Sequence, residues 1–391
     1  MRAKPNYILF ACWLMFFWST TVRAVFFTVV PAISFSLDFT AAQSGILLGV
    51  FFLGYASAVW ISGFVPGSRK SVVIGGAILS IVAFMLLSSL KSFPLFMIVA
   101  PLSSFGVGLY VPRGISLITE ISHFSNRGRN MSLHEVASVA GLVLGPLFVS
   151  FTLQKYFWEN IFLLWAVVGV FALIIFSGIM VTNEVPQKKA ESLGQLIHGS
   201  KFIYLILITS SMFVLLVGLI SILPTLMVHS WNIQPEYAAS FVGWTRVAAL
   251  AGLFGAGITS DYFGRLRLLS LLLGVSFVLL VIMAISGFNL IFTFCVVALA
   301  ITSAGAPPVF FAALAENYSE SSRDKIVGMV SGTGSILGVA CAPAIFGFLI
   351  ENFAPWMTFL VTAIIVLCGW LSTYRLRNMG FENRDKANVN V

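Results

Sequence analysis

Charged residues are scarce in this chain of 391 residues: they make up 9% of it, with 14 acidic residues against 22 basic ones. Soluble globular domains contain about 25% charged residues. The deficit therefore excludes an ordinary water-soluble domain. The hydrophobic fraction is 59%, which is typical of a protein that crosses a membrane many times.

Residues that carry enzymatic or metal chemistry are equally few. The chain has four cysteines and four histidines, and the cysteines show no metal-ligand or redox spacing. It also contains no glycine-rich nucleotide-binding loop and no nucleophile constellation. We therefore expect no enzyme, no ATP-driven pump, no cofactor and no metal site, and we expect all four cysteines to be reduced core residues.

Long apolar stretches define the predicted fold. About 20 apolar residues are needed to cross a bilayer as a helix. Twelve such stretches are present, at 7–34, 41–65, 71–90, 93–119, 131–153, 158–181, 202–228, 236–260, 267–287, 289–314, 326–350 and 356–376. The first is too long for a cleaved signal peptide, so we interpret it as a retained helix. The sequence thus predicts an all-α polytopic membrane protein.

The basic residues indicate an orientation. With both termini cytoplasmic, seventeen lysines and arginines fall on the inner side and two, Lys91 and Lys155, on the outer side. This asymmetry follows the positive-inside rule and predicts a multi-pass protein of the inner membrane. The net charge of +8 is then explained by contact with an anionic inner leaflet, and no nucleic-acid partner is expected.

The sequence indicates two halves in which the same residues recur. A polar connector at 182–201 separates an N-terminal bundle of six spans (1–181) from a C-terminal one (202–377), which a tail (378–391) follows. Glu120, Arg127 and Arg129 recur as Glu316, Arg323 and Lys325, each 196 residues later. Parallel repeats of this kind place a binding site at their interface in many secondary transporters.

One loop carries a family resemblance. Residues 257–267 read Gly257-Ile-Thr-Ser-Asp261-Tyr-Phe-Gly264-Arg265-Leu-Arg267. This resembles the short-loop signature G-x-x-x-D-x-x-G-R-x-R/K of the major facilitator superfamily. The resemblance implies two pseudo-symmetric six-helix bundles, with spans 1, 4, 7 and 10 around a central cavity.

A second element resembles the same superfamily. The fifth span contains Gly141-x-x-x-Gly145-Pro146. Small residues at this spacing allow helices to approach closely, and proline bends the helix. We assign these residues and the repeated Glu316 and Arg323 to the scaffold and its gating loops.

Three arginines lie inside spans and have no charged counterpart in the other half: Arg23, Arg113 and Arg246. An arginine inside a membrane is costly and marks a functional hypothesis. Because arginine stays charged, we expect an electropositive cavity that binds an anion such as a carboxylate or phosphate. Tyr110 and Trp244 are secondary candidates for this site. The alternative is that each arginine binds helix-end carbonyls or extends to the interface.

Acidic residues near these arginines are candidates for proton coupling. Glu120 lies seven residues after Arg113, so both can lie on one helix face about 10.5 Å apart. A carboxylate near an arginine can load and release a proton as a substrate changes its field. Alternatively, Glu120 and Glu316 bridge to Arg127 and Arg323 at an inner gate. His134 and Glu135 form a second titratable pair, for which a structural role at a helix end is the alternative.

A narrower resemblance concerns the first half. Arg23, the run Gln43-Ser-Gly45-Ile-Leu-Leu-Gly49-Val-Phe-Phe-Leu-Gly54-Tyr55 and Gly106-x-Gly108-x-x-x-Pro112 look like the anion:cation symporters. In that family, arginines at the positions of Arg23 and Arg113 coordinate an organic carboxylate, and an acid at that of Glu120 carries the proton. Two departures are Val22, where an acid is often found, and a degenerate first-half loop at residues 63–70.

Three functions are therefore weighed. The first is a monomeric secondary transporter that moves a small organic anion together with protons across the lipid bilayer by alternating access. The second is a proton-coupled antiporter that exports drugs or metabolites, suggested by the glycine–proline element of the fifth span. The third is a receptor on a transporter scaffold, which we expect to need a soluble domain or a tail longer than the fourteen residues after Arg377.

Overall fold

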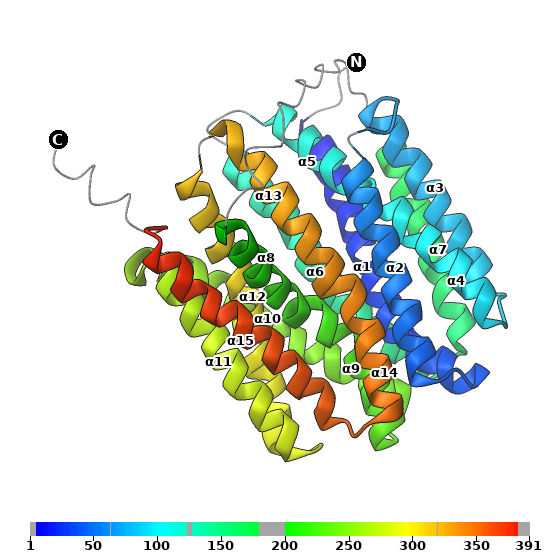
Figure 1. The fold of residues 1–391 in the computed structure, drawn as a ribbon. Coiled ribbons are helices and arrows are strands. Elements are labelled where there is room, and N and C mark those ends of the chain that lie inside the picture. The colour runs from blue at the N-terminus through cyan, green and yellow to red at the C-terminus, as the bar shows by residue number, and fades with distance from the viewer. Residues whose placement is uncertain (1–4, 63, 123–126, 180–199, 319, 382–391) are drawn as a thin grey trace. The chain divides into compact units, whose positions relative to one another are not determined.

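The computed structural model describes residues 5–62, 64–122, 127–179, 200–318 and 320–381 (Figure 1). Across these ranges the chain forms helices and turns and contains no strand. The helices of the first half are α1 (Pro5–Leu37), α2 (Ala41–Ile61), α3 (Arg69–Leu87), α4 (Phe93–Gly108), α5 (Tyr110–Ile121), α6 (Arg127–Leu153) and α7 (Trp158–Ser177). Those of the second half are α8 (Ser200–Phe213), α9 (Leu219–Trp231), α10 (Pro235–Phe263), α11 (Arg265–Ser286), α12 (Leu290–Asn317), α13 (Glu320–Ser335), α14 (Ala342–Asn352) and α15 (Trp356–Asn378).

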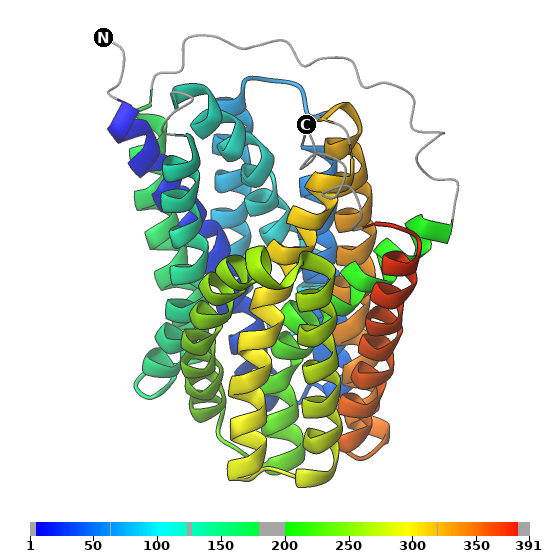
Figure 2. The ribbon, with the colours of Figure 1, turned by 90° about the vertical axis from the view of Figure 1, so that its left-hand side faces the viewer.

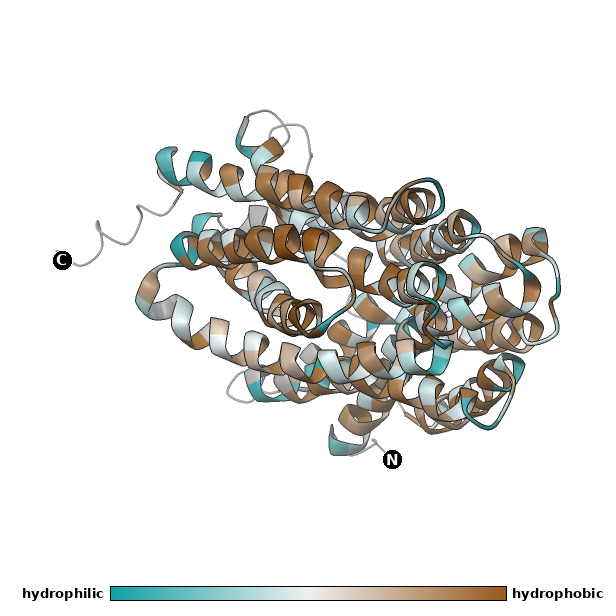
Figure 3. Ribbon diagram, turned by 90° about the horizontal axis from the view of Figure 1, so that it is seen from below, coloured by the Kyte–Doolittle hydropathy of each residue, from teal (hydrophilic) through white to brown (hydrophobic). Residues whose placement is uncertain are grey.

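Twelve segments of the described chain are long and apolar enough to cross a membrane. They coincide with the twelve predicted spans, so the predicted fold class is confirmed. Three spans contain more than one helix: α4 continues into α5, while the π-helical turns η2 (Val214–Gly218) and η3 (Ile336–Cys341) join α8 to α9 and α13 to α14. Figure 3 shows apolar residues along most of each helix and hydrophilic ones mainly near the ends.

Local sequence signals explain where several helices begin. Thr40 caps α2: its hydroxyl accepts a hydrogen bond from the amide of Gln43, whose side chain accepts one from the amide of Thr40. This reciprocal capping box satisfies two amides that a helix start leaves without partners. Between α10 and α11 the chain turns at Gly264, whose φ of 84° lies in the left-handed region that glycine adopts without strain.

The described chain divides into two compact units. Unit 1 contains Met1–Lys188 and Ser221–Trp244, and unit 2 contains Lys189–Ile220 and Thr245–Val391. Residues 221–244, which the repeat assigned to the C-terminal bundle, thus cluster with the first half. Within unit 1 this stretch reaches α1, because His229 Nε2 lies 3.1 Å from Ser34 Oγ. Most of the predicted connector (182–201) and the tail from residue 382 onward lie outside the described residues.

Corresponding helices are joined in the same way inside each unit. In unit 1, Trp18 of α1 donates from Nε1 to the carbonyl of Trp165 in α7, at 3.1 Å. In unit 2, Ser211 of α8 donates to the carbonyl of Ile365 in α15, at 2.8 Å. Each contact lies beside a glycine, Gly169 or Gly369. The first and last spans of both halves therefore meet at a close, hydrogen-bonded crossing.

Within unit 2, α11 lies against both α12 and α15. Figure 2 shows the short turn that links α11 to α12. None of the four cysteines, all of which are described, forms a disulfide. Cys12 and Cys295 are buried as expected, but Cys341 and Cys368 are exposed on their helices, so the expectation of four core cysteines is wrong for these two.

Candidate functional site

Arg23 lies in the middle of α1, half-buried within unit 1. Its guanidinium carbon is 4.3 Å from the centroid of the Tyr55 ring on α2, a separation typical of a cation–π interaction. One terminal nitrogen donates to Thr20 Oγ1 at 3.3 Å. The Nε atom is buried and has no hydrogen-bond partner, and none of the described ion pairs includes Arg23. An acceptor is therefore missing from this guanidinium.

Glu135 on α6 is the carboxylate that interacts electrostatically with Arg23. Its side chain is exposed. The two residues approach because α1 packs along α6 with glycines at the crossing. A Cβ atom added to Gly141 would lie 2.8 Å from Thr21 Oγ1, and one added to Gly145 would lie 2.7 Å from Ala24 Cβ. The helices thus meet at a distance that larger side chains would prevent.

His134 precedes Glu135 but lies in a different environment, fully buried in unit 1. Its ring stacks on Phe16, with centroids 4.2 Å apart, and its Nε2 atom is 2.9 Å from the Tyr110 hydroxyl. That hydroxyl donates to the carbonyl of Cys12 at 2.6 Å. Because the phenol has a single hydrogen, it accepts from Nε2, and we assign the ring proton to that atom. His134 and Tyr110 therefore join α5 and α6 to α1 in the core.

Arg113 is also buried, with 8% of its surface exposed, but it is bound to backbone. Its Nε atom donates to the carbonyl of Ser62 at 3.1 Å, and a terminal nitrogen donates to Ser62 and, at 2.8 Å, to Val65. Both carbonyls lie just beyond the end of α2, where a helix leaves acceptors without intrahelical partners. The geometry favours the alternative in which this arginine binds helix-end carbonyls.

Arg246 on α10 is 3% exposed and lies in unit 2. A terminal nitrogen donates to the carbonyl of Leu216 at 2.6 Å. Leu216 belongs to the π-helical turn η2, where the changed hydrogen-bond pattern accompanies functional or strained positions. The Nε atom of Arg246 is buried without a partner. Trp244 lies two residues earlier with 65% of its surface exposed.

Glu120 is held in an ion pair, and its partner is Arg69 at the start of α3. Glu316 forms the equivalent pair with Arg265 at the start of α11, with 2.5 Å between Nε and Oε1. Arg69 and Arg265 are themselves 196 residues apart, so the repeat includes the whole pair. Glu120 thus belongs with the repeated scaffold, and applying the same offset to Arg265 would have revealed Arg69 from sequence.

For the other predicted gate residues, the structure describes the position in the fold and few side-chain contacts. Pro146 lies inside α6, about five turns from its beginning at Arg127. Gly257 and Asp261 lie in α10 and Arg323 in α13, but their side-chain environments lie outside the described part of the structure, as does that of Arg127. Among the described residues, no group of three or more histidine, cysteine or acidic side chains is arranged to hold a metal ion.

Comparison with known proteins decides the family. A family model described as the Major Facilitator Superfamily matches residues 12–245 and 205–386. The chain belongs to the Major Facilitator Superfamily. Its narrower placement among the anion:cation symporters receives no support from these comparisons and remains a prediction.

Curated relatives match only part of the chain. Multidrug resistance protein MdtL of Escherichia coli O127:H6 (strain E2348/69 / EPEC) is 26% identical over 174 residues, which are 42% of this chain and 44% of that protein. The protein of the same name from Citrobacter koseri (strain ATCC BAA-895 / CDC 4225-83 / SGSC4696) is 25% identical over 176 residues, covering 42% and 45%. The matched region thus spans less than half of each relative.

Solved structures show the same fold over nearly the whole chain. A bacterial homolog of the human lysosomal transporter Spinster has a TM-score of 0.81 at 15% identity, covering 96% of this chain and 98% of that one. The D-xylose-proton symporter has a TM-score of 0.74 at 13% identity, covering 94% and 96%. The nucleoside transporter NupG has 0.71 at 13%, covering 94% and 98%. At these identities the likeness shows the fold alone.

Proposed function

We propose that this member of the superfamily is a monomeric secondary transporter that moves a small organic anion by alternating access, with protons as the coupled ion. The observation that carries the proposal is Arg23, a permanent charge inside span α1 whose buried Nε lacks a hydrogen-bond partner. A buried donor without an acceptor is destabilising by about 1–3 kcal/mol. A bound anion would supply that acceptor.

A carboxylate suits this position best. The guanidinium presents donors in a fixed planar fork that matches two carboxylate oxygens. Tyr55 at 4.3 Å and Thr20 at 3.3 Å hold the side chain in place, so less conformational freedom is lost when the anion binds. Arg113 and Arg246 differ from Arg23, because backbone carbonyls take up their terminal nitrogens.

Glu135 is the best candidate for the proton site. The positive charge of Arg23 acts on its carboxylate, and a bound anion would offset that charge. Binding of the anion and binding of a proton to Glu135 would then favour each other, which is the thermodynamic requirement for symport. Its exposed side chain allows proton exchange. Glu120, in contrast, is engaged by Arg69.

Uptake by proteoliposomes tests this proposal. The purified protein is assayed with radiolabelled monocarboxylates, dicarboxylates and sugar acids under an inward proton gradient. Arg23→Gln should abolish uptake, while Glu135→Gln should lose the response to the gradient but keep exchange of anion for anion. Arg129→Gln, which changes an exposed arginine on α6, serves as the matched control. Normal uptake by Arg23→Gln would refute the role of this residue.

A second candidate is an efflux antiporter, which the partial match to multidrug resistance proteins favours. Its cargo would need to be anionic or amphiphilic, because Arg23 would repel cations. Deletion and overexpression strains exposed to a panel of anionic and cationic toxins separate the two functions. Export predicts sensitivity on deletion and proton movement opposite to the cargo, whereas symport predicts proton movement with it.

We also propose that the basic ends of the bundles face the cytoplasm, as the positive-inside rule requires. Lys70 and Lys155 lie at opposite ends of unit 1, next to the start of α3 and the end of α6 respectively. Single cysteines introduced at the two positions, in a variant without its own cysteines, can be labelled with an impermeant thiol reagent on intact cells. Labelling of the cysteine at position 155 alone is expected.

A further inference from the structure

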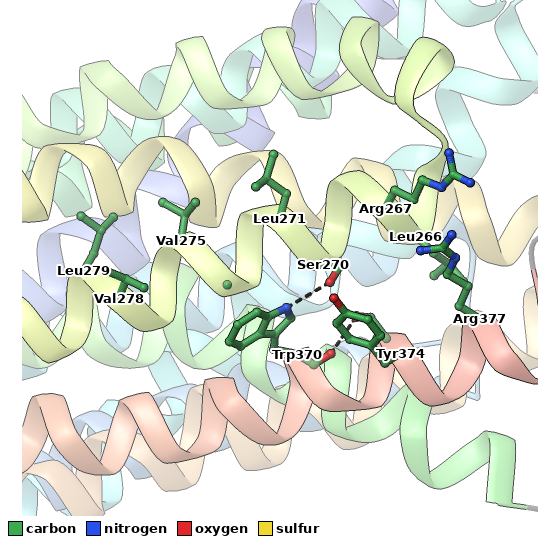
Figure 4. A pocket seen from close by; sticks show the side chains of 12 residues that line it. Leu266, Arg267, Ser270, Leu271, Val275, Val278, Leu279, Trp370, Tyr374 and Arg377 are labelled. Atoms are coloured by element: carbon green, nitrogen blue, oxygen red, sulfur yellow. Dashed lines mark hydrogen bonds between the residues drawn. The ribbon is translucent and has the colours of Figure 1, made fainter.

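A groove of about 490 Å³ lies between α11 and α15 in unit 2, and it takes no part in the site proposed above (Figure 4). Trp370 of α15 forms part of its floor. The indole donates from Nε1 to Ser270 Oγ at 3.0 Å, and the ring rests on Gly274, where an added Cβ would lie 2.9 Å from Trp370 Cε2. Gly274 also lines the groove, and its missing side chain leaves room for the indole between the two helices.

One end of the groove is apolar and open to the surroundings. Leu271 and Val278 line it and expose 58% and 52% of their surfaces. Both residues lie inside the span Arg265–Ser286. An exposed apolar side chain at this depth of a membrane contacts the acyl chains of lipids. A hollow lined by such side chains can therefore hold an acyl chain.

The other end is basic. Arg267 in the first turn of α11 and Arg377 in the last turn of α15 both line the groove, and both are exposed. Figure 4 shows their guanidiniums at the same end, with the hydroxyl of Tyr374 between them and the apolar part. Two arginines and a phenol at the edge of a span form a set of donors suited to a phosphate.

We propose that this groove binds an anionic phospholipid, with its phosphate on Arg267 and Arg377 and an acyl chain along Leu271 and Val278. The order of the lining residues, charged at the membrane edge and apolar toward its interior, matches the order of groups along such a lipid. The predicted orientation places the basic end at the inner leaflet, whose anionic lipids attract arginines at the surface. The site is separate from Arg23 and does not depend on the transported substrate.

Native mass spectrometry of the full-length protein in detergent tests this assignment. Dioleoyl phosphatidylglycerol is titrated against dioleoyl phosphatidylcholine, which has the same chains and no net charge, and against glycerol 3-phosphate, which has no chains. Two arginines should favour the anionic lipid by about 30-fold, from about 1 kcal/mol for each basic residue near the surface. The variant Arg267→Gln/Arg377→Gln should bind both lipids equally.

Two further variants separate the lipid site from general surface charge. Arg375→Gln removes an exposed arginine in the same last turn of α15 that does not line the groove, and it should keep the preference. Val278→Trp fills the apolar end and should weaken the binding of both lipids. The proposal is overturned if the double variant keeps the preference, if Arg375→Gln loses it, or if glycerol 3-phosphate competes as well as the lipid does.

Discussion

Glu120 is bound to Arg69, which lies 51 residues earlier in the chain, and Glu316 is bound to Arg265 at the same separation of 51 residues. Each pair connects the end of one span to the start of an earlier one within its own unit. Because both members recur in both halves, the pair is a property of the repeated scaffold. We expect a transported ion to use residues that occur in one half only. Arg23 and Glu135 are such residues.

The two ion pairs should contribute similarly and modestly to stability. Their side chains are 19–29% exposed in the first half and 25–46% in the second, and exposed pairs contribute about 0.2–1 kcal/mol. Double-mutant cycles built from Arg69→Ala with Glu120→Ala, and from Arg265→Ala with Glu316→Ala, should therefore give favourable coupling below about 1 kcal/mol in both halves. Thermal unfolding in detergent measures it. Coupling in one half alone would contradict the shared role.

Arg113 should matter for stability more than for substrate affinity. Arg113→Ala leaves the carbonyls of Ser62 and Val65 without this donor, so we expect the free energy of unfolding to fall by about 1–3 kcal/mol. Arg129→Ala, at an exposed site on α6, should change it by less than about 0.5 kcal/mol. The KM of any remaining transport should be unchanged. A variant with normal stability and no substrate binding would instead place Arg113 in the site.

Tyr55 should support substrate binding through Arg23. Removing the ring in Tyr55→Leu frees the guanidinium, and loss of a partly buried cation–π contact of about 1 kcal/mol corresponds to about a five-fold rise in apparent KM. Tyr55→Phe keeps the ring and should stay close to the native value. Concentration dependence of proteoliposome uptake distinguishes the two. Equal effects of both substitutions would point to the hydroxyl instead of the ring.

Two glycines three residues apart on α10 should respond in opposite ways to alanine. A Cβ atom at Gly252 would overlap the carbonyl of Ile301 on α12, whereas one at Gly255 meets nothing within 4 Å. Gly252→Ala should therefore destabilise the protein by about 1–3 kcal/mol through overpacking. Gly255→Ala should stabilise the helix by up to about 1 kcal/mol. The unfolding temperatures of the two variants, measured side by side, should fall for Gly252→Ala and rise for Gly255→Ala.

The spans could be predicted from the sequence because each depends on residues close together in the chain, and the repeat could be predicted because like residues recur at a constant spacing. Any stretch of about 20 apolar residues must be helical in a bilayer, since its backbone groups have no other partners there. The repeated glutamates and arginines were likewise visible as a constant offset. The partner of Glu120 was missed because the offset was applied to Arg127 and not to Arg265, whose counterpart is Arg69.

The roles of the arginines depended on tertiary structure. Sequence identifies Arg23, Arg113 and Arg246 as charges inside spans, and the chemistry of arginine makes them alike. What separates them is the group that each guanidinium meets. Arg113 donates to two carbonyls at the end of α2, and Arg246 donates to the carbonyl of Leu216. Arg23 instead donates to the hydroxyl of Thr20 and lies against the Tyr55 ring. The membrane-spanning fold follows from local composition, whereas the candidate site follows from packing between helices distant in the chain.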